Sequence, residues 1–174
     1  IGGVGVDAGG EGSISYVTIV SGDIILNSAT QAVGNNASLQ SSGSINGSGP
    51  IMADVVVMAA ASGIGNTVPI ATQAISITAS NGLGAIHLQN TSSAATDVPL
   101  LVTNTGGSIR FVQTGGGALN LHHVQSGPNE SLGAANIGLV NGGGSMLLVG
   151  SVSAGGTGSI DLSASGDLVL GGLS

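Results

Sequence analysis

The sequence predicts an all-β fold, a right-handed parallel β-helix (β-solenoid) of roughly eight or nine short coils. Three observations indicate it: a recurring turn-and-strand phrase, short stretches in which apolar and polar residues alternate, and an aliphatic interior almost free of aromatic residues. The turns between these stretches are rich in Gly, Ser and Asn. We expect residues 1–174 to form a single β-solenoid domain, which is either an excerpt of a larger protein or a repeating unit of a larger assembly.

The recurring phrase is a Gly, then Ser, Ala or Asp, then alternating aliphatic residues. It occupies residues 12–17, 22–26, 43–45, 84–88, 107–112, 117–121, 144–148, 158–162 and 166–170. A glycine-containing turn followed by alternating β-branched and aliphatic residues is typical of a turn that leads into a short strand. Each phrase therefore predicts one short strand.

Alternation within the strands predicts which side chains face the interior. Residues 75–78 and 86–89 alternate apolar with polar side chains, so one face of each strand points inward and the other outward. Interior glycines disfavour helices by about 1 kcal/mol each relative to Ala. The local structure is expected to be β throughout.

Very short strands, Gly-rich turns and a core without rings favour a solenoid over a sandwich or a barrel. Stacked coils lie about 4.8 Å apart, so inward positions sit above one another and small aliphatic side chains form ladders in a narrow interior. A coil of about 20 residues gives the eight or nine coils and a rod roughly 40 Å long.

Composition excludes several classes of partner. Of 174 residues 33 are Gly and 5% are charged, the formal net charge is −7, and Arg110 is the only basic residue. A protein needs several Lys or Arg residues to bind nucleic acid or an anionic membrane, so neither is expected as a partner. The longest apolar run, residues 55–61, is far shorter than the roughly 20 residues that cross a bilayer, and no membrane insertion is expected.

Several segments resemble a known family of repeats. They are residues 62–65, 68–72, 75–79 and 84–90, a shortened second copy over 98–111, and the Ser-Gly-Asp turns at 21–23 and 165–167. Together they resemble the repeats of filamentous-haemagglutinin-like bacterial surface exoproteins, which are large secreted right-handed parallel β-helices. The family's Asn-Pro-Asn-Gly secretion motif is absent, and residues 127–129 do not replace it. The resemblance implies an extracellular or cell-surface shaft, two-partner-secreted or autotransported, that serves adhesion, biofilm cohesion or a surface filament.

A fragment of a calcium motif opens the chain. Residues 2–7 fit the first six positions of the nonapeptide GGxGxDxUx, in which Asp7 would supply a carboxylate. Gly9 stands where a large aliphatic residue is needed, and no tandem copy follows, although calcium rolls share each ion between adjacent turns. We therefore expect a plain glycine turn and no cofactor, with calcium at Asp7 as the alternative.

The histidines and the arginine are expected on the surface. His122 and His123 are adjacent, and adjacent side chains on a strand point to opposite faces, so both cannot easily bind one metal. His87 and Arg110 each lie between apolar residues that face inward, so both should project outward. Arg110 is expected as an exposed cation that could pair with a carboxylate or a neighbouring subunit.

The acidic residues do not predict an active site. Parallel β-helix enzymes that act on polysaccharides cluster acids on one face, whereas the acids here are scattered: Asp7, Glu11, Asp23, Asp54, Asp97, Glu130, Asp161 and Asp167. Asp161 and Asp167 would be a pair only if they stacked on successive coils. No catalytic residues are predicted, and the protein is not expected to be an enzyme.

The expected function follows from the ends of a solenoid, because unpaired strand edges template association unless they are capped. No capping segment is evident in the sequence. We expect a structural unit of the bacterial surface that self-associates end to end, with outward Ser, Thr and Asn rows available to host or matrix carbohydrate. The alternatives are a monomeric glycan- or receptor-binding adhesin shaft and, third, a degenerate β-helix enzyme.

Overall fold

The computed structural model describes residues 6–127 and 134–171, and every regular element within them is a β-strand. In chain order these are β1 (Val6–Asp7), β2 (Ile14–Val17), β3 (Ile24–Leu26), β4 (Thr30–Ser41), β5 (Ile45–Gly47), β6 (Ile51–Ala60), β7 (Ile70–Gln73), β8 (Ser76–Leu83), β9 (Ile86–Thr91), β10 (Thr96–Thr105), β11 (Ile109–Thr114), β12 (Leu119–Ser126), β13 (Ile137–Asn141), β14 (Met146–Ala154), β15 (Ile160–Ala164) and β16 (Leu168–Leu170). Within these ranges there is no helix that could span a membrane.

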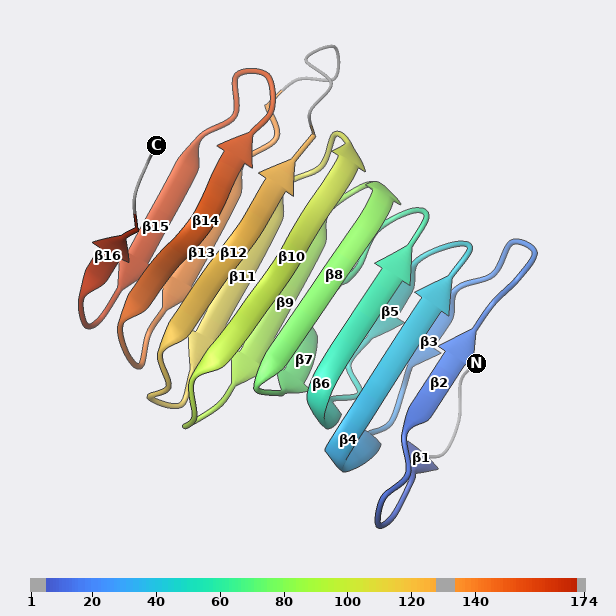
Figure 1. The fold of residues 1–174 in the computed structure, drawn as a ribbon. Helices are drawn as coiled ribbons and strands as arrows, with labels where there is room; N and C mark the ends of the chain where they lie inside the picture. Colours follow the sequence, from blue (N-terminus) through green and yellow to red (C-terminus); the bar gives the residue numbers. More distant parts are fainter. Residues whose placement is uncertain (1–5, 128–133, 172–174) are drawn as a thin grey trace.

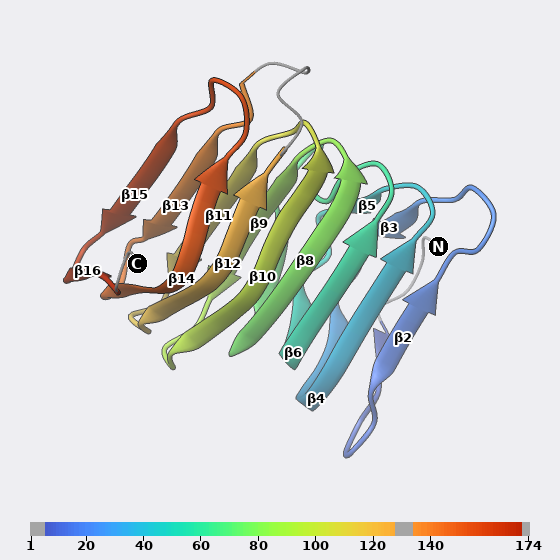
Figure 2. The same cartoon turned by 45° about the horizontal axis from the view of Figure 1, so that its top comes forward.

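The strands wind into a parallel β-solenoid. The interior strands pair in parallel with strands of the coils before and after them. Figures 1 and 2 show one layer that contains β2, β4, β6, β8, β10, β12 and β14 and a second that contains β3, β5, β9, β11, β13 and β15. The predicted all-β parallel solenoid is thus confirmed.

A ladder of isoleucines runs along the second layer and counts the coils. Seven Ile residues pair successively, one per coil, namely Ile24, Ile45, Ile64, Ile86, Ile109, Ile137 and Ile160. Successive members are separated by as few as 19 residues (Ile45 to Ile64) and as many as 28 (Ile109 to Ile137). The solenoid has about seven coils, slightly fewer than predicted, because most coils are longer than 20 residues.

A second ladder lines the inside of the first layer. Its members are Tyr16, Leu39, Met58, Ala79, Leu101, Val124 and Val152. The side chains of this ladder pack against the isoleucines of the opposite layer in one continuous core. A single buried ring, that of Phe111, enters the interior, so the predicted aliphatic core is confirmed.

One corner of the interior is polar. Asn90 is fully buried, and its side-chain amide donates to the Ala74 carbonyl (3.0 Å), to Thr96 Oγ1 (3.1 Å) and to Gln113 Oε1 (2.8 Å). Its side-chain oxygen accepts from the Ala74 N–H (3.0 Å) and from Thr72 Oγ1 (2.9 Å). The network ties together coils that carry β7, β9 and β11, and it is stable because every polar atom of Asn90 has a partner.

Glycine is required where coils approach one another closely. Gly107 has a φ of +93°, and a Cβ there would clash with the Gly84 carbonyl of the preceding coil. Both the left-handed conformation and the backbone contact exclude a side chain. Gly107 begins one of the recurring phrases, so the phrase marks a turn that must stack directly on the turn below it.

Candidate functional site

The C-terminal coil presents three strand edges without a partner among the described residues. β15 pairs only with β13, and β16 pairs only with the first part of β14. The second part of β14, from Ser151 to Ala154, pairs with β12 on one side only. Edges of this kind carry free N–H and C=O groups that another strand can pair with.

The ladders also end exposed at this coil. Ile160, Leu168 and Leu170 continue the ladders that contain Ile137, Met146 and Leu148, yet they are 45%, 43% and 53% exposed. Their counterparts one coil earlier are buried. Inward-facing apolar side chains and open backbone edges thus coincide on one surface, which we call the C-terminal edge: β15, β16 and residues 151–154.

The N-terminal coil differs from the C-terminal coil in the burial of its ladder side chains. β2 and β3 each pair on one side only within the described residues, but Ile24 is 1% exposed and Leu26 is 5% exposed. The expectation of open backbone edges holds at both ends of the described solenoid, whereas exposed ladder side chains occur at the C-terminal edge. The β2–β3 turn instead exposes Ile19 and Val20 on its outside.

A depression of about 340 Å³ lies on the outer surface of β9, β11, β13 and β15. One outward row crosses it from coil to coil in the order His87, Arg110, Gly138 and Asp161. Arg110 and Asp161 are exposed on either side of Gly138, which has no side chain to fill the space between them. Arg110 and His87 project outward as predicted.

A second outward row borders the depression. Asn136 is held between neighbouring coils, because its N–H donates to Ser108 Oγ (3.2 Å) and its Oδ1 accepts from both the N–H (2.9 Å) and the hydroxyl (3.1 Å) of Ser159. Burial, together with the nearby Arg110 charge, lowers the pKa of His87, and a hydrogen bond with the Gly65 backbone acts in the opposite direction. His87 is therefore neutral at pH 7, and Arg110 is the cation of this surface.

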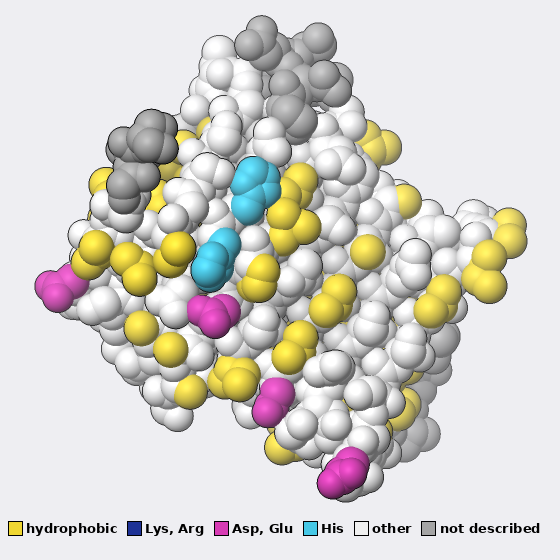
Figure 3. Space-filling view, in the orientation of Figure 1, with side chains coloured by type: hydrophobic (Ala, Val, Ile, Leu, Met, Phe, Trp, Pro, Cys, Tyr) yellow, Lys and Arg dark blue, Asp and Glu magenta, His cyan; other side chains and the backbone are white. Residues whose placement is uncertain are grey.

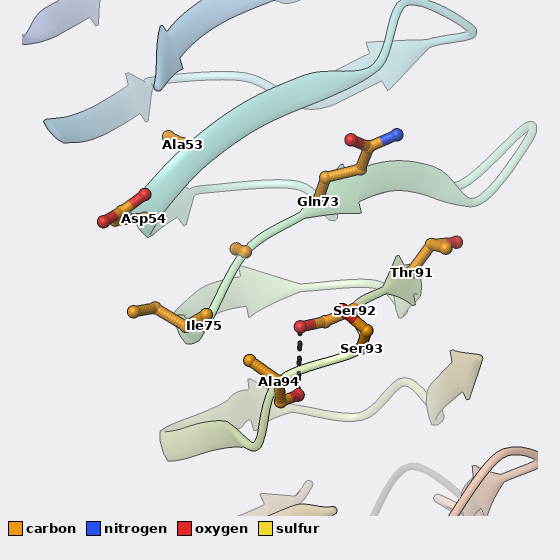
Figure 4. A pocket seen from close by; sticks show the side chains of 9 residues that line it. Ala53, Asp54, Gln73, Ile75, Thr91, Ser92, Ser93 and Ala94 are labelled. Carbon is orange, nitrogen blue, oxygen red and sulfur yellow. Dashed lines mark hydrogen bonds between the residues drawn. The ribbon is translucent and has the colours of Figure 1, made fainter. Parts of the chain in front are cut away.

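A second, smaller depression of about 290 Å³ marks the place where the coils widen (Figure 4). In the narrower coil the chain passes from Gln73 through Ala74 to Ile75, whereas in the next coil residues 92–95 form a longer loop at the same corner. Asp54, Gln73, Ile75 and Ser92 line the step. The Ser92 hydroxyl donates to the Ala94 carbonyl of its own loop (3.0 Å), and Asp54 Oδ1 accepts from the Gly34 N–H at the irregular part of β4 (3.1 Å). Both side chains therefore stabilise the local backbone.

The prediction that His122 and His123 point to opposite faces is wrong. The register between β12 and β14 shifts between Leu121 and His123, and the buried residues on either side are Leu121 and Val124. The strand bends here, so that both histidines lie outside the core, and Figure 3 shows histidine side chains on this face. His123 Nδ1 is 2.9 Å from Ser151 Oγ, which anchors that ring to the next coil.

The structure does not pair Asp161 with Asp167. Asp161 lies on β15, and Asp167 immediately precedes β16 in the same coil, so they do not stack on successive coils. Asp97 accepts a hydrogen bond from Asn120 (2.8 Å), and Asp23 accepts from the N–H and the hydroxyl of Ser44. These carboxylates hold neighbouring coils together, and Glu130 lies outside the described residues.

Asp7 is exposed on β1, where it pairs with Gln31 of β4. The glycines of the calcium-like fragment, residues 2–5, lie outside the described residues. In the described ranges, no three His, Asp or Glu side chains are grouped closely enough to hold a metal ion.

The fold defines the protein as a parallel β-solenoid. Comparisons with protein-family models, with curated proteins and with solved structures found no match to this chain.

Proposed function

We propose that this protein is a non-enzymatic structural protein of the bacterial surface, a β-solenoid unit that stacks end to end on further copies of itself in an extracellular filament or adhesin stalk. The observation that carries the proposal is the C-terminal edge, where open strand edges and exposed ladder side chains coincide. Burying those apolar side chains contributes about 25 cal/mol for each Å² removed from water. The natural occupant is another parallel coil that continues the same ladders.

The first coil of a second copy has the residues that such a junction needs. Pairing of β15 with β3 of the next copy would place Ile160 beside Ile24 and Leu162 beside Leu26. Pairing of residues 151–154 with β2 would place Val152 beside Tyr16. An Ile–Ile contact at the junction repeats the contact already made between successive coils within the chain. Because Ile24 is already buried, stacking requires a rearrangement around it, which should slow the addition of each copy.

The cell-surface setting and the role in adhesion or biofilm cohesion rest on the resemblance of residues 62–90 to filamentous-haemagglutinin-like repeats. The rarity of charge supports close lateral packing of rods, since the lateral face in Figure 3 bears few charged side chains. A monomeric shaft that binds glycans or a receptor is the second candidate, and the depression between Arg110 and Asp161 is the observation that favours it.

Electron microscopy of the purified protein over a concentration series tests the proposal, with Ile160→Lys as the edge variant and Val57→Lys as its control. Val57 is exposed on the lateral face of β6, far from either end. The wild type and Val57→Lys should form long filaments with an axial repeat near 4.8 Å, whereas Ile160→Lys should remain as short rods. Short rods of the wild type at every concentration, or normal filaments of Ile160→Lys, would contradict end-to-end stacking.

A further inference from the structure

The depression over Gly138 has a positive wall and a negative wall. Arg110 and Asp161 are separated by one coil, that of Gly138, so their backbones lie about 10 Å apart. Both side chains are on the outer surface. A ligand lying across Gly138 would therefore meet a guanidinium at one end and a carboxylate at the other.

The floor and the border of the depression are already ordered. Gly138 belongs to β13 between two buried side chains, Ile137 and Leu139. The bordering residue Asn136 is held on both neighbouring coils, through its backbone N–H to Ser108 Oγ and through its side-chain oxygen to Ser159. A ligand that binds here would not have to order a loop, so little entropy would be lost by the protein.

We propose that this depression binds a small zwitterion of about dipeptide length, with its carboxylate on Arg110 and its ammonium group on Asp161. A guanidinium binds a carboxylate through two parallel hydrogen bonds. The chain as a whole carries a net charge of −7, which disfavours a simple anion. A ligand without net charge avoids that repulsion and still uses both walls.

A dipeptide can be accommodated between the walls. The charged ends of an extended dipeptide lie about 7 Å apart, because each residue spans about 3.3–3.6 Å. A hydrogen bond of about 2.8 Å at each end brings the distance between the guanidinium and the carboxylate to about 12–13 Å, so the long Arg110 side chain must lean away from Asp161 beyond the roughly 10 Å between the backbones. The volume of about 340 Å³ accommodates a molecule of this length.

The test is an NMR titration of the isotope-labelled protein, kept below the concentration at which filaments form, with glycylglycine, followed through the backbone amide signals of Arg110, Gly138 and Asp161. Acetate and ethylamine serve as probes that are purely anionic and purely cationic. We expect glycylglycine to saturate these shifts in the millimolar range and to bind at least about tenfold more tightly than either of them, since each of these probes loses one charged contact. Acetate binding as tightly as glycylglycine would overturn the proposal in favour of a simple anion site.

Gly138→Leu should abolish the shifts, because the new side chain fills the depression. This variant should fold, since a Cβ at Gly138 has no atom within 4 Å and its φ lies outside the left-handed region. Gln125→Leu, on the outer surface of β12, is the matched control and should bind normally. Unchanged binding by Gly138→Leu would overturn the proposal.

An exchange of charges provides the sharper test. Arg110→Asp and Asp161→Arg should each weaken glycylglycine binding at least about tenfold, through loss of a charged contact. The double variant should recover it, because a zwitterion can bind in the reverse direction. Failure of the double variant to recover binding, while it remains folded by circular dichroism, would contradict the two-wall arrangement. This inference does not depend on end-to-end stacking.

Discussion

Ile24 and Ile160 stand at opposite ends of one ladder, and they differ in burial. Both lie inside the coil at equivalent positions of the second layer, but Ile24 is 1% exposed and Ile160 is 45% exposed. Residue type and strand position are the same, so the difference reflects what lies next to each coil. Ile24 is covered by neighbouring residues. Ile160 instead exposes to solvent the side-chain surface that, in an interior coil, packs against the next coil.

This difference shows that at β15 and β16 the inward side chains and the strand edges are open within the described residues, so the same packing can continue into a further coil. Each coil is stabilised by the two coils that flank it, as in other repeat architectures. The C-terminal coil has one flanking coil within the described residues and leaves Ile160, Leu168 and Leu170 exposed, so it is less stabilised than the interior coils. Substitutions at the end and in the interior of the isoleucine ladder measure how much each position contributes to the free energy of unfolding.

The largest expected effect is at the middle of the isoleucine ladder. Ile86 is completely buried between Ile64 and Ile109, so Ile86→Ala should lower the free energy of unfolding by about 2–5 kcal/mol. Ile160→Ala, measured at dilution, should cost less than about 1 kcal/mol because much of the side chain is already in water. Urea denaturation of both variants measures the contrast, and equal costs at the two positions would contradict the account of the edge.

A smaller effect is expected from the buried polar corner. Asn90→Ala removes the partner of Gln113 and of the Ala74 backbone groups, and each buried group left without a partner costs about 1–3 kcal/mol. We expect a loss of about 3 kcal/mol in the free energy of unfolding. Asn120→Ala is the control, since Asn120 makes an exposed hydrogen bond to Asp97, and it should cost about 0.5 kcal/mol or less. If both variants lost stability equally, the corner would not be a structural network.

Local features of the fold were predictable from the sequence because they depend on neighbouring residues. The phrase at residues 107–112 predicts a turn and then a strand with Ile109 and Phe111 inside, and β11 has that form. The outward directions of His87 and Arg110 follow from the same alternation. The predicted coil number was slightly high because the coils differ in length.

Features that depend on stacking were not predictable. The outward direction of both His122 and His123 requires the bend opposite Val149 and Gly150 of the next coil, which alternation along one strand does not show. Arg110 and Asp161 are 51 residues apart, and their row through Gly138 depends on the register of two long coils. Gly138 belongs to none of the recurring phrases, so the sequence offered no signal for the depression.

Hydrogen–deuterium exchange as a function of protein concentration tests the central claim most directly. Amide groups of β15, β16 and residues 151–154 should exchange quickly in dilute solution and become protected at high concentration, because stacking gives their strands a partner. Amide groups of β9 and β11 should be protected under both conditions. Protection at the C-terminal edge that is independent of concentration, or absent even in concentrated solution, would contradict the account.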